Sequence, residues 1–141
     1  MGSRMKLTSR LLLVMATVIG SLALTAGPAN AASCYGSSCK GRNPQTAGCG
    51  ADAVTLHSVT TPYGIRVELR WSETCGAAWG RILNAWPGDL VIVEGSGYVT
   101  YQATVKTGHD AFTAMVDDRY PRTARACGGA NTRDLRCTLY V

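Results

Sequence analysis

Histidine is scarce in this chain of 141 residues, which contains only two. His57 and His109 lie in no motif with a serine or an aspartate that would indicate hydrolysis by a nucleophile and a base. Ser96 lies between two glycines but lacks the full pattern of a nucleophile elbow, and the acidic residues are not spaced as a catalytic carboxylate pair. The sequence therefore predicts a protein without enzymatic activity.

Metal-ligand spacing and a second long apolar run are absent as well. The chain has no Cys-x-x-Cys and no paired histidines, so we expect neither a zinc site nor another cofactor. After residue 31 no segment approaches the roughly 20 apolar residues of a bilayer span. Once the N-terminal segment is removed, no membrane contact is expected.

The N-terminus has the three parts of a cleavable secretion signal. These are a positive start (Arg4, Lys6 and Arg10), an apolar stretch over 11–24, and the small-x-small site Ala29-Asn30-Ala31. We expect residues 1–31 to be a signal peptide and the protein to be secreted into the extracellular space.

Charge also changes when residues 1–31 are removed. Three of the fourteen Lys and Arg lie there, so residues 32–141 carry eleven basic and nine acidic residues, a net charge of +2. A balance this close to neutral argues against a nucleic-acid partner. Near the C-terminus, basic and acidic residues alternate and are expected to form a solvated, self-compensated face: Arg119, Arg122, Arg125, Arg133 and Arg136 with Asp117, Asp118 and Asp134.

All six cysteines follow the predicted signal, which indicates a disulfide framework. They are Cys34, Cys39, Cys49, Cys75, Cys127 and Cys137. The last two flank a turn-forming stretch over 128–131, so a bridge across a hairpin is expected. The first four are left to one another, either as Cys34 with Cys39 and Cys49 with Cys75 or in a crossed arrangement.

Alternation of apolar and polar residues predicts strands in the second part of the chain. The expected strands are 65–72, a hairpin of 90–93 with 98–105, then 111–116, and a last strand through Leu135, Cys137 and Leu139 that closes the sheet. Residues 32–53 have few apolar side chains and should form a stapled loop segment without a core of its own. The predicted fold is all-β: a small, disulfide-stapled antiparallel sheet over 54–141, arranged as a sandwich or an open barrel.

Residues 75–86 combine two signals. Their apolar residues fall at the spacing of a helix face: Cys75, Trp79, Ile82, Leu83 and Trp86. Gly76 and Gly80 oppose a helix, since each costs about 1 kcal/mol relative to alanine in a helix interior. We favour a strand that pairs back on 65–71, and one short helix near 75–86 remains the alternative.

Aromatic residues are the most informative candidates for a contact surface. Trp71 and Trp79 can pack with apolar neighbours and are expected in the core. Trp86 precedes Pro87-Gly88 in a predicted turn, and Tyr98 lies opposite the apolar face of its strand. Together with Tyr35 of the stapled segment, these two residues are the candidate contacts.

The N-terminal half resembles the YjfA family of small secreted proteins and domains of Gram-positive bacteria. That family is abundant in Streptomyces, and the function of most members is unknown. The resemblance runs from Cys34 to about Asp89 and is carried by short strings: Cys34 to Gly41, Asn43-Pro44, Gly48-Cys49, Asp52-Ala53, Val67 to Ser72, Cys75, Ala78-Trp79 and Pro87-Gly88-Asp89. It implies secretion and a stapled domain, and it supplies no catalytic residues.

A second resemblance is to the small cysteine-containing subunits of the umbrella toxin particles that Streptomyces secrete. In those antibacterial particles a small protein bridges a lectin-bearing subunit and a long toxin-bearing stalk. The resemblance implies a bridging role for this chain.

Taken with its composition, the sequence predicts a secreted, non-enzymatic binding or adaptor protein whose partners are other secreted proteins. Binding would use surface complementarity or a strand added at a sheet edge, and residues 33–51 would carry the contact. One alternative is an inhibitor of a secreted hydrolase, in which a stapled loop enters an active site. Another is a module that binds cell-wall polysaccharide through Trp86 and Tyr98.

Overall fold

The computed structural model describes residues 31–132 and 134–141. The predicted signal peptide, apart from Ala31, and Arg133 of the arginine-rich tail therefore lie outside the described residues. Within the described ranges, no helix has the length and the apolar content needed to cross a membrane.

Nine strands and one short helix make up the described chain. The 3-10 helix η1 covers Gly36–Cys39, and the strands are β1 (Val54–Thr60), β2 (Arg66–Ser72), β3 (Ala77–Leu83), β4 (Leu90–Gly95), β5 (Val99–Thr104), β6 (Ala111–Phe112), β7 (Val116–Asp117), β8 (Ala124–Gly129) and β9 (Arg136–Cys137). The prediction of an all-β fold is confirmed.

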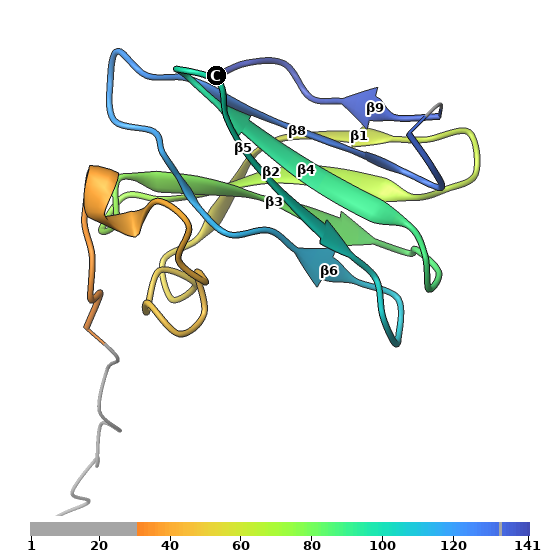
Figure 1. The fold of residues 1–141 in the computed structure, drawn as a ribbon, viewed down its shortest axis with the longest axis horizontal. Helices are drawn as coiled ribbons and strands as arrows, with labels where there is room; N and C mark the ends of the chain where they lie inside the picture. Colours follow the sequence, from red (N-terminus) through yellow and green to blue (C-terminus); the bar gives the residue numbers. More distant parts are fainter. Residues whose placement is uncertain (1–30, 133) are drawn as a thin grey trace, which may run out of the picture.

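The strands form two antiparallel sheets that pack face to face (Figure 1). The first sheet has the order β1-β2-β3-β6, with β7 also paired to β3, and the second has the order β5-β4-β8-β9. Figure 1 shows β4, β5 and β8 lying across β1, β2 and β3. Over the described residues neither sheet closes on itself, so the molecule is a sandwich and not a barrel.

One hydrophobic core lies between the two sheets. Alternate residues of β2, β3, β4 and β8 fill it: Val67, Leu69, Ile82, Val91, Val93 and Ala126. Gly80 lets the two sheets approach each other closely within this core. A Cβ at this position would lie 2.9 Å from the Val91 Cγ2 and 3.2 Å from the Ile92 carbonyl oxygen. The glycine that argues against a helix in the sequence is therefore a packing requirement of the sandwich.

Residues 77–83 form strand β3, and the alternative of a short helix near 75–86 is wrong. β3 pairs with β2 along its whole length, from Ser72 opposite Ala77 to Arg66 opposite Leu83. Trp79 and Ile82 belong to different cores on opposite faces of the strand. The helical spacing arises by chance, because Trp79, Ile82 and Leu83 lie in the strand while Cys75 and Trp86 lie in the turns before and after it.

The predicted hairpin of β4 and β5 is confirmed, with Gly95 opposite Val99 at the turn. The predicted strand 111–116 is instead two short strands, β6 and β7, that both pair with β3. Between them the Thr113 N–H still donates to the Gly80 carbonyl of β3 at 2.9 Å, and two residues later the Met115 N–H donates to the Arg42 carbonyl at 3.0 Å. A hydrogen bond to the N-terminal segment therefore interrupts this strand.

The C-terminal tail does not close the sheet, which corrects the sequence-based prediction. Its regular strand, β9, is two residues long and pairs only with β8. Beyond it, the Thr138 N–H donates to the Ala126 carbonyl at 2.8 Å, and Val141 and Ala124 exchange backbone hydrogen bonds of 3.0 and 3.1 Å. The tail thus follows β8 as the edge of its own sheet.

Candidate functional site

The N-terminal segment, residues 32–53, forms a compact platform beside one end of β2 and β3 (Figure 1). Its apolar residues do not fold alone: they share a second buried core with the outer face of β3. The core consists of Cys34, Cys39, Ala47, Cys49, Cys75, Ala77, Trp79 and Met115, with Phe112 packed against it. Trp79 is 2 % exposed at its centre. The platform is therefore anchored on the side of the first sheet that faces away from the sandwich core.

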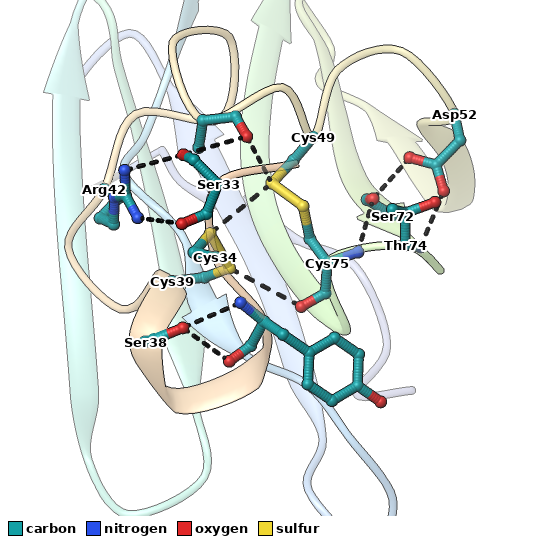
Figure 2. Close-up of a disulfide and its surroundings, with 12 residues drawn as sticks. Ser33, Cys34, Ser38, Cys39, Arg42, Cys49, Asp52, Ser72, Thr74 and Cys75 are labelled. Carbon is teal, nitrogen blue, oxygen red and sulfur yellow. Dashed lines mark hydrogen bonds between the residues drawn. A yellow bond between two sulfur atoms is a disulfide. The ribbon is translucent and has the colours of Figure 1, made fainter. Parts of the chain in front are cut away.

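Disulfide bonds fix this platform. Cys34 pairs with Cys39, Cys49 with Cys75, and Cys127 with Cys137, so the local pairing is confirmed and the crossed arrangement is wrong. Cys49 and Cys75 join the platform to the turn between β2 and β3 across 26 residues. In Figure 2 the two platform disulfides lie side by side, and the Cys34 and Cys49 sulfur atoms are 3.9 Å apart.

Polar side chains hold the rim of the platform. The Arg42 guanidinium donates to both the carbonyl and the hydroxyl of Ser33 at 2.8 Å. The Asp52 carboxylate accepts hydrogen bonds from the Ser72 hydroxyl and, at 2.9 Å, from the Thr74 N–H (Figure 2). Burial acts to raise the pKa of Asp52, but these hydrogen bonds outweigh it and leave the pKa below its ordinary value. Both ends of the segment are thus tied down by charged groups.

Tyr35 is presented on the surface of the platform. The residue is 58 % exposed, whereas its backbone is fixed, because its N–H donates to the Ser38 hydroxyl and that hydroxyl donates to its carbonyl. The Arg119 guanidinium lies 5.4 Å from the ring centroid, a cation–π contact. The next residue, Gly36, has a φ of 54°, and a Cβ there would overlap the Arg119 side chain. A glycine is needed at that position to let Arg119 reach the ring.

Asp117 fixes the Arg119 side chain that contacts Tyr35. Its carboxylate accepts two hydrogen bonds of 2.9 Å from Arg119 and lies 3.1 Å from the Arg122 Nε. The hydrogen bond from Arg119 lowers the pKa of Asp117, against the effect of burial. The Asp117 side chain is only 2 % exposed, whereas Arg119 is 38 % exposed, so in this part of the predicted solvated face a buried carboxylate holds the arginine that contacts Tyr35.

The four cysteines of the two disulfides at the platform, Cys34, Cys39, Cys49 and Cys75, also lie as close together as the ligands of a metal ion. Their sulfur atoms lie within 4.8 Å of one another, although the sequence has no Cys-x-x-Cys spacing that would predict such a cluster. Zinc binds thiolates, and here all four sulfur atoms are in disulfides. In the oxidised protein the cluster therefore serves as a covalent staple.

Residues 37–127 match the family described as "Protein of unknown function (DUF2690)". The chain belongs to the DUF2690 family. The matched range contains most of the platform and continues into β8. Platform and sandwich are thus parts of one DUF2690 unit. No curated protein and no solved structure matches this chain.

The other two predicted contacts of this DUF2690 protein lie apart from Tyr35. Trp86 follows β3 at the end opposite to the Cys75 turn and is 67 % exposed. Its backbone N–H donates to the Asp89 carboxylate at 2.7 Å, and its ring and the His109 ring form an edge-to-face pair with centroids 4.9 Å apart. Tyr98 lies in the turn between β4 and β5 with its ring fully exposed. The structure therefore does not gather the three candidates into one site.

Sequence reasoning missed two groups that the fold brings into the site regions. Asp118 was assigned to a solvated face, but burial, together with the negative charge of Asp117, raises its pKa to about 7. Its Oδ1 is buried and accepts no hydrogen bond from the described residues. Tyr140 donates its hydroxyl to Glu94 at 3.0 Å across 46 positions of sequence. No local pattern signals either arrangement.

Proposed function

We propose that this DUF2690 protein is a secreted, non-enzymatic adaptor that binds another secreted protein through its N-terminal platform. One observation carries the proposal: two of the three disulfides and a second buried core, which is shared with the outer face of β3, fix a segment that lies outside the sandwich core. A loop that is already ordered loses less conformational entropy when it binds a partner. Three disulfides in a domain of this size also suit an oxidising, extracellular compartment.

The platform surface suggests the chemistry of the partner. Residues 32–51 contain Lys40 and Arg42 and no acidic residue, and both basic residues are exposed, as is Tyr35. A basic segment that also exposes a tyrosine fits a partner with an acidic surface and a pocket or an apolar face for the tyrosine ring. Association should accordingly weaken as the ionic strength rises.

The resemblance to YjfA-like proteins of Streptomyces and to the bridging subunits of umbrella toxin particles supports a more specific role. In this role the protein would be a small bridging subunit of a secreted, multi-protein antibacterial particle. The platform would contact one partner, and another surface of the sandwich would contact a second.

The test is the size of the species that carries the protein in native secretions, purified without reduction. We expect it in a complex larger than the monomer, and we expect Tyr35→Ala to weaken that complex at least tenfold without changing thermal unfolding. Tyr63→Ala is the matched control, because Tyr63 is also exposed but lies in the turn between β1 and β2. A strictly monomeric profile at native concentration would overturn the proposal.

A further inference from the structure

A hollow of about 380 Å³ lies at the end of the second sheet, around the turn between β4 and β5. The polar and aromatic residues that line it are Glu94, Ser96, Tyr98, Thr100 and Tyr140. Its volume falls within the range of small-molecule sites. None of these residues belongs to the platform, so the hollow is separate from the proposed adaptor surface.

Tyr98 is placed at this hollow in a backbone conformation that disfavours tyrosine. Its φ is 63°, a left-handed conformation that costs a residue with a side chain about 1–2 kcal/mol. Its ring is fully exposed and so gains nothing from packing in the free protein. Because no packing of the ring offsets this backbone strain in the free protein, the ring is expected to serve in contact with a ligand.

Tyr140 is the second ring of the hollow, and it is half-exposed. The Arg125 guanidinium lies 4.7 Å from its ring centroid, and its hydroxyl donates to Glu94 Oε2. Held by its face and by its hydroxyl, this ring loses little freedom when a ligand binds. The hollow therefore combines a fixed ring with an exposed one.

Glu94 gives the hollow an oriented acceptor. The hydrogen bonds from Arg125 and Tyr140 both end on Oε2, and Oε1 accepts neither of them. The hydrogen bond from Arg125 lowers the pKa of Glu94, so the group is ionised at neutral pH. Because Arg125 balances its charge, the site presents an acceptor without a net charge.

These features select a chemical class of ligand. An anion would face the carboxylate of Glu94, a cation would compete with Arg125, and a purely apolar molecule would leave the acceptor unsatisfied. A pyranose ring has an apolar face for stacking on tyrosine and hydroxyl groups that donate to a carboxylate. The hydroxyls of Ser96 and Thr100 supply further partners around it.

We propose that this hollow, lined by Tyr98, Tyr140 and Glu94, is a binding site for a neutral saccharide. One face of the sugar stacks on a tyrosine ring, and a sugar hydroxyl donates to Glu94 Oε1. The protein would then hold a protein partner on its platform and a glycan at the opposite sheet. The two proposals rest on different residues and can fail separately.

The experiment titrates the oxidised protein with neutral hexasaccharides of glucose, mannose and N-acetylglucosamine, observed by amide NMR shifts. We expect at least one of them to shift the signals of residues 94–100 and 140 with a dissociation constant in the millimolar range or tighter. Tyr98→Ala should weaken this binding at least tenfold, and Tyr140→Phe, which removes the hydroxyl bonded to Glu94, should weaken it several-fold.

Tyr63→Ala again serves as the control, because it removes an exposed tyrosine outside the hollow. Equal loss of binding in Tyr98→Ala and Tyr63→Ala would overturn the proposal. So would the absence of shifts at residues 94–100 with all three sugars at 10 mM, a concentration of the order at which weak ligands saturate their sites. Neither result would affect the size of the native complex, and loss of that complex in Tyr35→Ala would not affect the titration.

Discussion

The Cys34 and Cys49 sulfur atoms lie 3.9 Å apart, although they belong to different disulfides. The two bridges therefore touch inside a single buried core above Trp79. The two disulfides have different structural roles. Cys49 with Cys75 joins distant parts of the chain across 26 residues, whereas Cys34 with Cys39 spans five residues and only shapes the segment around η1.

Removal of the longer bridge should destabilise the protein more than removal of the shorter one. Loop entropy predicts a loss of about 3.5 kcal/mol for Cys49→Ala with Cys75→Ala, against about 2 kcal/mol for Cys34→Ala with Cys39→Ala. Urea unfolding of the two double variants and the parent, all without reductant, measures both values. The reverse order would show that packing within the second core outweighs the loop entropy.

Trp79 should hold the platform on the sheet. Trp79→Ala removes the largest buried side chain of the second core and should lower the free energy of unfolding by about 3–5 kcal/mol. Trp86→Ala is the matched control, because that ring is largely exposed and its loss should change stability by about 0.5 kcal/mol or less.

Limited proteolysis provides a second readout for the same pair of variants. Under conditions in which the sandwich stays folded, cleavage within residues 32–53 should become faster in Trp79→Ala and remain at the parental rate in Trp86→Ala. Equal protection in both variants would mean that the disulfides alone hold the platform.

The sequence permits a prediction of the strands and of the disulfide between Cys127 and Cys137 because both are encoded locally, whereas it leaves the pairing of the first four cysteines open. Alternation over 65–72 and the turn between Cys127 and Cys137 each lie within one short window. Alternation also separates the two faces of β3, yet it does not reveal what covers the outer one. Much of the cover over Trp79 comes from a segment 30 to 45 positions earlier, from Cys34 to Cys49, that has almost no apolar pattern.

The binding regions are less predictable for the same reason. The strand pattern over 98–105 predicts that Tyr98 is exposed, and it is, although Tyr98 lies in the turn before β5 and not in the strand. Tyr140 and Glu94 meet only because the C-terminal tail follows β8. Asp118 looks like one acidic residue among arginines, and only the fold buries it. Contacts between separate elements create these groups, and the sequence contains no local trace of them.

Asp118 should make the protein less stable as the pH rises through neutrality. Its pKa is about 7 in the folded protein and near 3.8 in the unfolded chain, so between these values the folded state holds a proton that the unfolded state has released. Its contribution is complete below about pH 4 and is lost as the pH rises through 7. Because the carboxyl is partly open to solvent, we expect a loss on the order of 1 kcal/mol between pH 5.5 and 8.

Thermal unfolding at these two pH values tests the role of Asp118. Asp118→Asn should remove most of the difference, because the amide does not titrate. Asp110→Asn changes an exposed carboxyl in the loop before β6 and should leave the difference as it is in the parent. A slope that survives in Asp118→Asn would assign the pH dependence to another group.

Asp117 should act in the opposite direction, at low pH. Its pKa is held below 3.8 by Arg119, so its contribution is present at neutral pH and is lost as the pH falls below about 4. Asp117→Asn should reduce the free energy of unfolding at pH 7 by about 1.5–3 kcal/mol, the range for hydrogen bonds to charged groups. At pH 2 the variant and the parent should converge, and a constant difference across this range would contradict the assignment.

Tyr98→Asn should raise stability while it abolishes the proposed saccharide binding. Asparagine tolerates a φ near 63° better than tyrosine does, and no packing is lost because the Tyr98 ring is fully exposed. We expect a gain of up to about 1 kcal/mol in urea unfolding. Thr104→Asn, at an exposed position in β5 with ordinary strand conformation, lacks this relief and should be neutral or slightly destabilising. If Tyr98→Asn were also destabilising, the ring would have a structural role in the free protein, and the argument from unrelieved strain to ligand binding would no longer stand.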